Sequence, residues 1–524
     1  MRVAFPVPKS FTDHFRLAEK WQLMVTVLVA FLLRIWGIDF GLPYIYHPDE
    51  PRYVVIAQNI FKTGDLNPHF FNYPSLFFYL NALVYIPYYF AGSLMGAFRS
   101  PDDIPAPIML AMGTGQTPMP STFLLGRFLT VAFGCAVVVL VFLIGRRLTN
   151  NSMTGLLAAL MMATSPMNVA NSRYITPDTF LVFFALLAFW EAVQVFDKGD
   201  IRHYVAAGIA IGLVASTKYN GALIVIALVS AHFLRHGVKG FKEPNLYLAL
   251  VMSAVTFFAT TPFALLDHQK FLADLEFEGW HYSTGHAGME GNVLNWYLAY
   301  LWKTEGALSL FAIVEILRGI CMRSKKIVLL SVFPLAYFTF INNFAVRNDR
   351  TILPLTPFLF LLAASFLATL LVPATWRQSR WKWPMLVAGI FIILVSLILP
   401  LLQTVQGGFR LTAIDSRETA RIWIDRNLPP GSRIAIESYS PYVDPHRYTV
   451  QGFGWMIDET PEEFVANHFD YLVVSQGVYR RFYLEPDRYP NEIAKYDRLF
   501  RVFDLVKQFT DGGYEIRIYH ISPK

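Results

Sequence analysis

Apolar segments of membrane-spanning length follow one another through most of the chain, and they restrict its fold more than any other feature. A helix needs about 20 apolar residues to cross a bilayer. Only 16% of the 524 residues are charged, whereas a soluble globular chain carries roughly 25%. We therefore expect a polytopic α-helical membrane protein. The segments run at about 21–38, 74–97, 122–144, 153–169, 179–196, 203–216, 219–234, 244–263, 298–317, 327–344, 351–373 and 384–404.

The charges between these twelve segments decide how many of them cross the membrane. Short basic loops are normally cytoplasmic, and they lie here at 146–147, 235–239, 323–326 and 377–382. If every segment crossed, these loops would face the outside. If segment 74–97, which is rich in Tyr and Pro, lies in the outer interface instead, all of them become cytoplasmic. The pattern predicts about 11 transmembrane helices and a cytoplasmic N-terminus.

The same topology divides the chain into two domains. Residues 1–404 form the membrane domain, with long outer loops at about 39–121 and 265–296. Residues 405–524 read as a small soluble α/β domain on the outer side, with a helix at 415–427 and strands at 433–437, 471–475 and 514–521. The net charge of +6 is explained by cytoplasmic loops and does not call for nucleic acid. No cleavable signal is expected at the N-terminus.

An Asp-Glu pair, Asp49 and Glu50, follows the first apolar segment at the outer membrane surface. One interpretation is that Asp49 caps a helix that runs to Lys62, with Pro51 in its first turn and Gly64 after its end. The second interpretation is catalytic, because a carboxylate at that depth can take the proton of an acceptor hydroxyl. The two interpretations are compatible.

Further charged residues gather on the same outer side. Asp178 begins a segment and lies shortly after Arg173, so it is either a helix start or part of a site. Cations near a membrane usually have a partner, and a lipid phosphate suits Arg and Lys; the alternative is that they reach to headgroups. Three histidines in loop 265–296 match no metal motif, and a solvated loop is the preferred interpretation. The outward cations are Arg127, Lys218, Arg347 and Arg350.

These residues resemble the polyprenyl-phosphate-dependent GT-C glycosyltransferases. The first loop carries Pro-Asp-Glu-x-x-Tyr at residues 48–53, which looks like the first-loop motif of that superfamily. The nearest branches are the dolichyl-phosphate-mannose protein mannosyltransferases and the bacterial lipid A aminoarabinose transferases. The similarity covers roughly residues 20–360. Its other elements are Tyr73-Pro74, Gly126-Arg127-Phe128, Ser172-Arg173-Tyr174, Thr217-Lys218-Tyr219 and Arg350 shortly before Leu353-Pro354.

The resemblance implies an integral-membrane enzyme that transfers a sugar with inversion from a polyprenyl-phosphate donor to a hydroxyl acceptor on the outer face. The acceptor class, whether protein, lipid or cell-envelope glycan, differs between the branches and is not inherited. The resemblance makes Asp49 the general base and Glu50 its catalytic neighbour. It assigns substrate binding to Asp178, Arg173, Arg127, Lys218, Arg347, Arg350, Tyr53 and Tyr73.

One position departs from the aminoarabinose transferases. They carry an acidic residue and a lysine just before the interfacial helix, where this chain has Asn72 and Tyr73. We therefore assign no metal ligand and no cofactor, and a divalent cation remains open. The bacterial inner membrane is the default location.

Two other functions compete with this interpretation. A multispan transporter or flippase usually shows ionisable groups near the mid-plane and repeated halves, whereas the acids here lie at the ends of segments. A membrane-anchored binding protein would use only the C-terminal domain. Substituting Asp49 separates the three, because only glycosyl transfer depends on that carboxylate.

Overall fold

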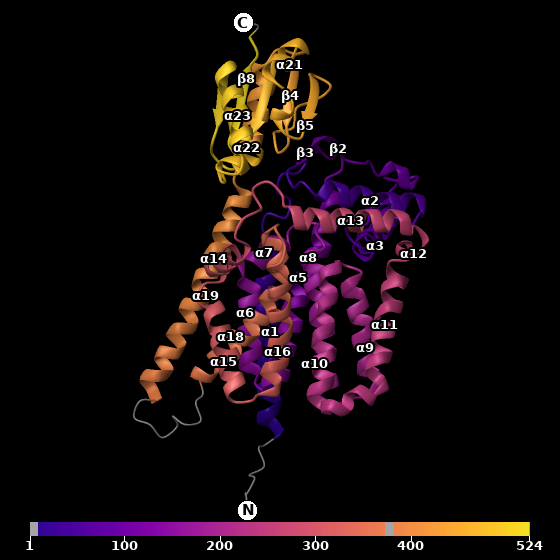
Figure 1. Cartoon of the computed structure of the whole chain (residues 1–524), viewed down its shortest axis with the longest axis vertical. Helices are drawn as coiled ribbons and strands as arrows, with labels where there is room; N and C mark the ends of the chain where they lie inside the picture. Colours follow the sequence, from indigo (N-terminus) through magenta and orange to yellow (C-terminus); the bar gives the residue numbers. More distant parts are fainter. Residues whose placement is uncertain (1–8, 372–381, 523–524) are drawn as a thin grey trace, which may run out of the picture.

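The computed structural model describes residues 9–371 and 382–522. Of the basic loop expected at 377–382, only the backbone of the last residue lies within that range. The described chain forms a tall helical bundle with a sheet-containing domain above one end (Figure 1).

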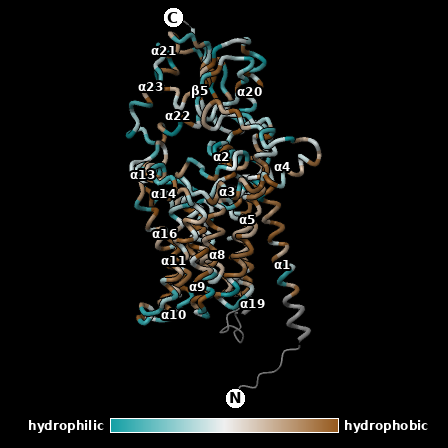
Figure 2. Tube along the Cα trace, turned by 90° about the vertical axis from the view of Figure 1, so that its right-hand side faces the viewer, coloured by the Kyte–Doolittle hydropathy of each residue, from teal (hydrophilic) through white to brown (hydrophobic). Residues whose placement is uncertain are grey.

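Most of the expected apolar segments are helices of the bundle. The bundle helices are α1 (Lys9–Ile35), α5 (Ser121–Thr149), α6 (Ser152–Thr164), α7 (Pro166–Asn171), α8 (Asp178–Asp197), α9 (Ile201–Ala215), α10 (Val225–His236), α11 (Pro244–Thr260), α14 (Val293–Glu305), α15 (Leu308–Cys321), α16 (Lys325–Ile341), α18 (Thr356–Leu371) and α19 (Lys382–Thr412). Within the described residues, five helical stretches are long and apolar enough to cross a membrane, and shorter apolar helices accompany them. Figure 2 shows hydrophobic residues along the bundle and hydrophilic ones at its ends and in the upper domain.

Local signals explain where several of these helices begin and end. Asn150 adopts the left-handed conformation (φ 53°) after α5, and the Asn151 side chain accepts a hydrogen bond from the Met153 N–H at the start of α6. Gly306, with φ 58°, separates α14 from α15. The apolar run expected at 298–317 is therefore two helices.

Short helices lie across the upper end of the bundle (Figure 1). They include α2 (Glu50–Thr63), α3 (Leu76–Leu83), α4 (Tyr85–Leu94), α12 (Phe263–Leu266) and α13 (His268–Thr284). Segment 74–97 is thus broken into α3 and α4, and α3 packs against α2. At 1.5 Å per residue each of the two is far shorter than the roughly 30 Å hydrocarbon core.

The upper domain is a five-stranded sheet covered by helices. The strand order is β5-β4-β6-β8-β7, with β4 parallel to β5 and β6, and β8 antiparallel to β6 and β7. Strands β5 and β7 were absent from the sequence prediction because both are edge strands with few buried residues. The elements are α20 (Ser416–Asn427), β4 (Arg433–Glu437), β5 (Thr449–Phe453), α21 (Pro461–Ala466), β6 (Tyr471–Ser475), α22 (Gln476–Tyr483), α23 (Pro490–Val502), β7 (Asp504–Phe509) and β8 (Ile516–His520).

A small sheet in the first loop holds the upper domain against the bundle. It consists of β1 (Tyr44–Ile45), β2 (Ile108–Ala111) and β3 (Thr114–Gln116), in the order β1-β3-β2. The backbone N–H of Tyr439 donates to the Met112 carbonyl at 2.8 Å, and the Thr114 hydroxyl donates to the Ser440 carbonyl at 2.8 Å. On the other side α19 continues past the expected boundary at residue 404 into the domain.

Candidate active site

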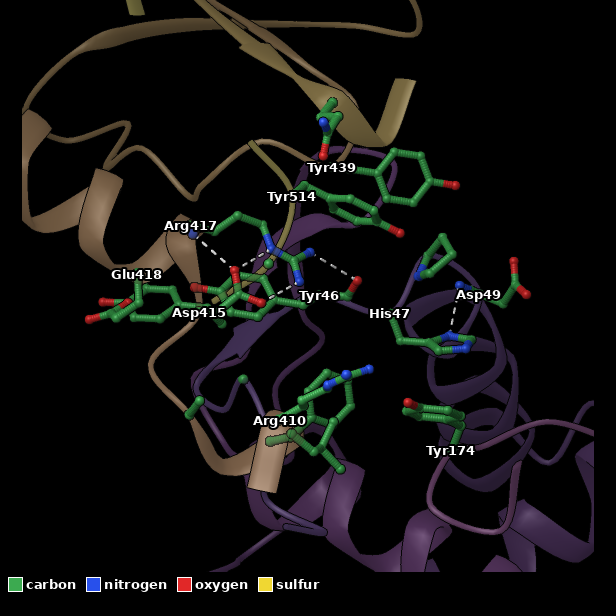
Figure 3. Close-up of a pocket in the computed structure, with 18 of the residues that line it drawn as sticks. Tyr46, His47, Asp49, Tyr174, Arg410, Asp415, Arg417, Glu418, Tyr439 and Tyr514 are labelled. Carbon is green, nitrogen blue, oxygen red and sulfur yellow. Dashed lines mark hydrogen bonds and ion pairs between the residues drawn. The ribbon is translucent and has the colours of Figure 1, made fainter. Parts of the chain in front are cut away.

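A cavity of about 880 Å³ lies where the upper domain meets the bundle. Figure 3 shows residues of its lining, which come from the first loop, the turn between α7 and α8, the end of α19 and the upper domain. Asp49, His47 and Tyr174 line its bundle side, and Tyr439 and Tyr514 line the domain side. Residues as far apart in the sequence as His47 and Tyr514 thus form one chamber.

Asp49 occupies the N-cap position of α2, but its side chain makes no capping hydrogen bond. The cap is instead supplied by His47, whose Nδ1 accepts from the backbone N–H groups of Asp49 (3.3 Å) and Glu50 (3.4 Å). The expected capping role of the Asp49 carboxylate is therefore wrong, although Pro51 and Gly64 do mark the two ends of the helix. Because His47 satisfies the helix end, the carboxylate is available for other contacts.

The Asp49 carboxylate pairs with Arg350 at 2.7 Å. Arg350 lies on α17 (Asp349–Ile352), a four-residue helix that leads into the 3₁₀ turn Leu353–Leu355 and α18. Burial alone would raise the pKa of Asp49, but the charge of Arg350 and its hydrogen bond outweigh it and hold the pKa below its ordinary value. About a third of the Asp49 side chain stays exposed to the cavity, so an ionised carboxylate faces it.

Glu50 points away from the cavity. Its two oxygens accept from Arg127 Nε (2.9 Å) and Nη2 (2.7 Å), and the Ile175 N–H adds a third hydrogen bond at 2.9 Å. Both charged side chains are fully buried. Burial would raise the pKa of Glu50, but the Arg127 charge and its hydrogen bonds outweigh this and lower the pKa. Glu50 therefore joins α2, α5 and the turn before α8, and it does not reach a cavity wall.

A second, more apolar cavity of about 400 Å³ lies on the other side of α17. Arg350 lines the first cavity and the next residue, Thr351, lines the second. Lys218 enters this second cavity and donates to Asp178 at 2.8 Å. Its other lining residues include Asn72, Tyr73, Tyr219, Leu275, Tyr282, Phe340 and Phe344.

The predicted site residues fall into three groups. Asp49 and Arg350 pair at the first cavity, and the ring centroid of Tyr53 lies 5.8 Å from that of Tyr73, which lines the second cavity. Lys218 and Asp178 form the pair described above. The remaining predicted residues, Glu50, Arg127, Arg173 and Arg347, lie outside both cavity linings. Arg173 donates to the Leu33 carbonyl, and Arg347 pairs with Glu485 of the upper domain at 3.0 Å.

Several cavity residues were missed by the sequence prediction. His47 adjoins the Asp-Glu pair, so proximity could have suggested it. Arg410, Arg480 and Arg481 line the first cavity from α19 and α22, and no local sequence signal connects them to Asp49. Within the described ranges, no group of three or more His, Cys, Asp and Glu side chains is arranged to hold a metal ion. His286 of the outer loop instead lies 3.2 Å from Arg481.

Comparisons with known proteins agree with this architecture. Residues 110–273 match the family model described as dolichyl-phosphate-mannose-protein mannosyltransferase. An undecaprenyl phosphate-alpha-4-amino-4-deoxy-L-arabinose arabinosyl transferase 2 of Pseudomonas fluorescens is 26% identical over 270 residues, which are 51% of this chain. The match spans 44% of the length of that relative, which is less than half of it.

Two solved structures share the fold over nearly the whole chain. ArnT from Cupriavidus metallidurans, bound to undecaprenyl phosphate, has a TM-score of 0.54 at 15% identity, covering 96% of this chain and 98% of that one. The oligosaccharyltransferase AglB from Archaeoglobus fulgidus, in complex with an inhibitory peptide and a dolichol-phosphate, has a TM-score of 0.56 at 13% identity, with coverages of 98% and 75%. The bundle with its appended domain is therefore a known membrane fold.

Proposed function

We propose that this chain, an integral membrane protein related to the GT-C polyprenyl-phosphate-dependent glycosyltransferases, is an inverting glycosyltransferase that acts at the outer face of the membrane. The observation that carries the proposal is the position of Asp49. Its carboxylate lines the large cavity and pairs with Arg350, whose neighbour Thr351 lines a smaller, more apolar cavity that contains a lysine. A base between an acceptor chamber and a lipid-phosphate chamber has the geometry that glycosyl transfer needs.

The second cavity suits the donor. Its aromatic and aliphatic lining can hold the first part of a prenyl chain. Lys218 has three N–H donors, and Asp178 occupies one of them. The other two can bind a phosphate, which Lys approaches as a point charge. Arg350, one residue before Thr351 in the lining, is placed to contribute a second cation.

The first cavity suits a sugar-containing acceptor. The rings of Tyr46, Tyr174, Tyr439 and Tyr514 contribute to its walls (Figure 3). Tyrosine presents an apolar face together with a hydroxyl, a combination that suits contact with partly apolar, partly polar ligands. The volume of about 880 Å³ exceeds what a single sugar needs, so we infer an acceptor larger than one sugar.

The reaction then requires one displacement. Asp49 takes the proton of the acceptor hydroxyl as its oxygen attacks the anomeric carbon of the donor. The bond from that carbon to the phosphate oxygen breaks, and the electron pair leaves with the polyprenyl phosphate. Lys218 and Arg350 stabilise the charge that develops on this phosphate. When Arg350 turns toward the phosphate, its hold on Asp49 weakens, and the carboxylate becomes a better base.

We further propose the topology expected from the charges. Counting α14 and α15 as one broken span and α6 and α7 as another gives the eleven crossings predicted for the bundle. Segment 74–97 then lies in the outer interface as α3 and α4. The N-terminus and the basic loops are cytoplasmic, the two cavities and the upper domain are outside, and the domain boundary lies where α19 ends. The bacterial inner membrane remains the proposed location.

The test is transfer from a panel of radiolabelled polyprenyl-phosphate sugars to membrane extracts, in proteoliposomes with equal amounts of protein. Wild type should transfer label and Asp49→Asn should not, while both bind the donor lipid. Asp39→Asn is the matched control, because Asp39 is exposed in the same loop and lines neither cavity. Equal transfer by wild type and Asp49→Asn would refute the assignment of the base. The divalent cation left open by the sequence is checked by the same assay after chelation.

A further inference from the structure

Three arginines line the large cavity without an ion pair to a carboxylate of the described chain. Arg410 extends from the last turn of α19 into the cavity (Figure 3), and Arg480 and Arg481 line it from the last turn of α22. Among the described residues, none has a carboxylate within ion-pair distance of these three guanidinium groups. The lining therefore presents unpaired positive charge to a molecule that enters the cavity.

The other charged groups of the cavity are already paired. Asp415 accepts from Arg417 at 2.8 Å, and Glu418 accepts from Arg421 at 2.6 Å. Asp49 pairs with Arg350, as described above. The remaining acid of the lining, Asp349, contacts only the Tyr300 hydroxyl, at 3.4 Å, among the interactions of the described chain. The excess of the three arginines over this one acid is not cancelled inside the chamber.

Arg481 is held in place. Its Nε donates to the Gly477 carbonyl at 2.9 Å, and its guanidinium lies 5.1 Å from the centre of the Tyr439 ring. The turn at Gly288 packs directly against its side chain, since a Cβ at that glycine would come within 2.8 Å of the Arg481 Cβ. Contacts of this kind reduce the conformational entropy that the arginine would lose on binding a ligand. The arrangement thus resembles a prepared binding position more than a solvated side chain.

We propose that these three arginines form an anion subsite for the acceptor, and that the acceptor is an acidic glycan. This inference rests on the proposed function, which it deepens by naming the acceptor class. Guanidinium groups bind carboxylate and phosphate oxygens in a bidentate way, and the tyrosines of the same cavity contact the sugar rings. A uronic acid or a phosphorylated sugar supplies both features. Lys218, the proposed phosphate ligand, lines the second cavity and not this one, so the subsite binds a different group from the donor phosphate.

Phospholipid headgroups offer the same anionic chemistry. Arg410 lies at the end of a bundle helix, from which arginines commonly reach to headgroups. The two sources differ in what they predict, because a soluble acidic saccharide binds only if the subsite serves the acceptor. The experiment therefore measures saccharides and lipids in separate arms.

The test measures saccharide affinity in nanodiscs of phosphatidylcholine, without any donor. The probes are trigalacturonic acid against neutral maltotriose, and mannose 6-phosphate against mannose. Wild type should bind each acidic probe at least tenfold more tightly than its neutral counterpart, since hydrogen bonds to charged groups contribute roughly this much. The preference should weaken as salt is added.

Two variants assign the effect to the subsite. Arg410→Ala/Arg480→Ala should remove most of the preference, because Arg481 alone remains, and should leave affinity for the neutral sugars unchanged. Arg426→Ala deletes the same charge from an exposed position on α20, outside the cavity, and should keep the preference. Retained binding of undecaprenyl phosphate by the double variant verifies that this variant is folded. The single variants Arg410→Ala and Arg480→Ala should each lose part of the preference for acidic probes.

Absence of any acidic preference in wild type, or its survival in the double variant, would overturn the proposal. Arginine-dependent association with phosphatidylglycerol nanodiscs, without saccharide binding, would assign the anion to a headgroup and overturn it as well. Because no donor is present, these outcomes are independent of sugar transfer. Failure of the Asp49 assay with acidic saccharide binding intact would refute the enzyme and retain an acidic-glycan binding site.

Discussion

Replacing Arg127 by Met should destabilise the folded chain far more than its distance from the cavities suggests. The substitution leaves the Glu50 carboxylate fully buried, with only the Ile175 N–H from among its three hydrogen-bond donors. Breaking one side of a buried ion pair costs about 3–5 kcal/mol. The Ile38 and Phe40 carbonyls, which accept from the same arginine, also lose their partner. We expect a total loss at the upper end of that range.

The double variant Arg127→Met/Glu50→Leu should be more stable than Arg127→Met alone. Removing both charges eliminates the stranded carboxylate and leaves unsatisfied backbone groups that cost about 1–3 kcal/mol. Unfolding in dodecyl maltoside/SDS mixed micelles, followed by tryptophan fluorescence, measures all three proteins. Arg146→Met is the control on the same helix, because Arg146 makes a half-exposed 3.4 Å pair with Glu19 and should lose less than about 1 kcal/mol.

Two results would refute this reasoning. If Arg127→Met and Arg146→Met were equally stable, the buried pair would not hold the fold together. If Glu50→Gln kept its stability but lost transfer completely, Glu50 would act on the substrate, and its position away from the cavity would not describe the active state.

Three further predictions concern pH and packing. Burial lowers the pKa of His47 below its ordinary 6.5, so the hydrogen bonds that His47 accepts at the start of α2 are kept above pH 6.5 and are lost as the pH falls below it. Sugar transfer measured against pH should therefore decline below pH 6.5, by an amount corresponding to about 1 kcal/mol. His47→Gln accepts the same N–H bonds without titrating and should flatten this pH profile. Burial raises the pKa of Glu437 from 4.5 to about 7. Its contribution of about 3 kcal/mol to the free energy of unfolding is therefore present below pH 4.5 and is lost as the pH rises to 7. Thermal unfolding of the full chain should show this loss of stability in wild type and not in Glu437→Gln. Gly452→Ala places a Cβ 2.0 Å from the Leu110 carbonyl oxygen, so it should displace β2 and β3 and lower the free energy of unfolding by about 1–3 kcal/mol. Gly454→Ala, whose Cβ has ordinary contact distances, is the control. We expect a lower unfolding temperature for Gly452→Ala alone.

Much of the bundle could be predicted because spanning helices leave a strong local signal. Apolar length located almost every bundle helix, and charge alternation singled out segment 74–97, which folds as α3 and α4. The same method could not see the break at Gly306, since the apolar pattern continues across it. Strands β5 and β7 lacked the alternating apolar pattern that identifies a strand, because edge strands bury few side chains.

The site was predicted less completely. The sequence singled out Asp49, which lines the large cavity, but it did not predict that Asp49 and Glu50 point in different directions. Successive residues of a helix point about 100° apart, and only the fold decides which direction meets the cavity. Arg127 and Arg350, which hold these two carboxylates, are distant in the sequence. The three lining arginines come from α19 and α22, and no local sequence pattern predicts that these two helices meet at one cavity.

The four-residue helix α17 has a kinetic consequence. Arg350 lines one cavity and Thr351 the other, so under the proposed function the lipid-phosphate donor and the glycan acceptor occupy separate chambers. Either can bind first, and the spent lipid can leave while the extended glycan stays. Initial rates measured against both substrates should therefore follow a random sequential scheme with intersecting lines, and a glycan with several acceptor positions could receive more than one sugar before it dissociates.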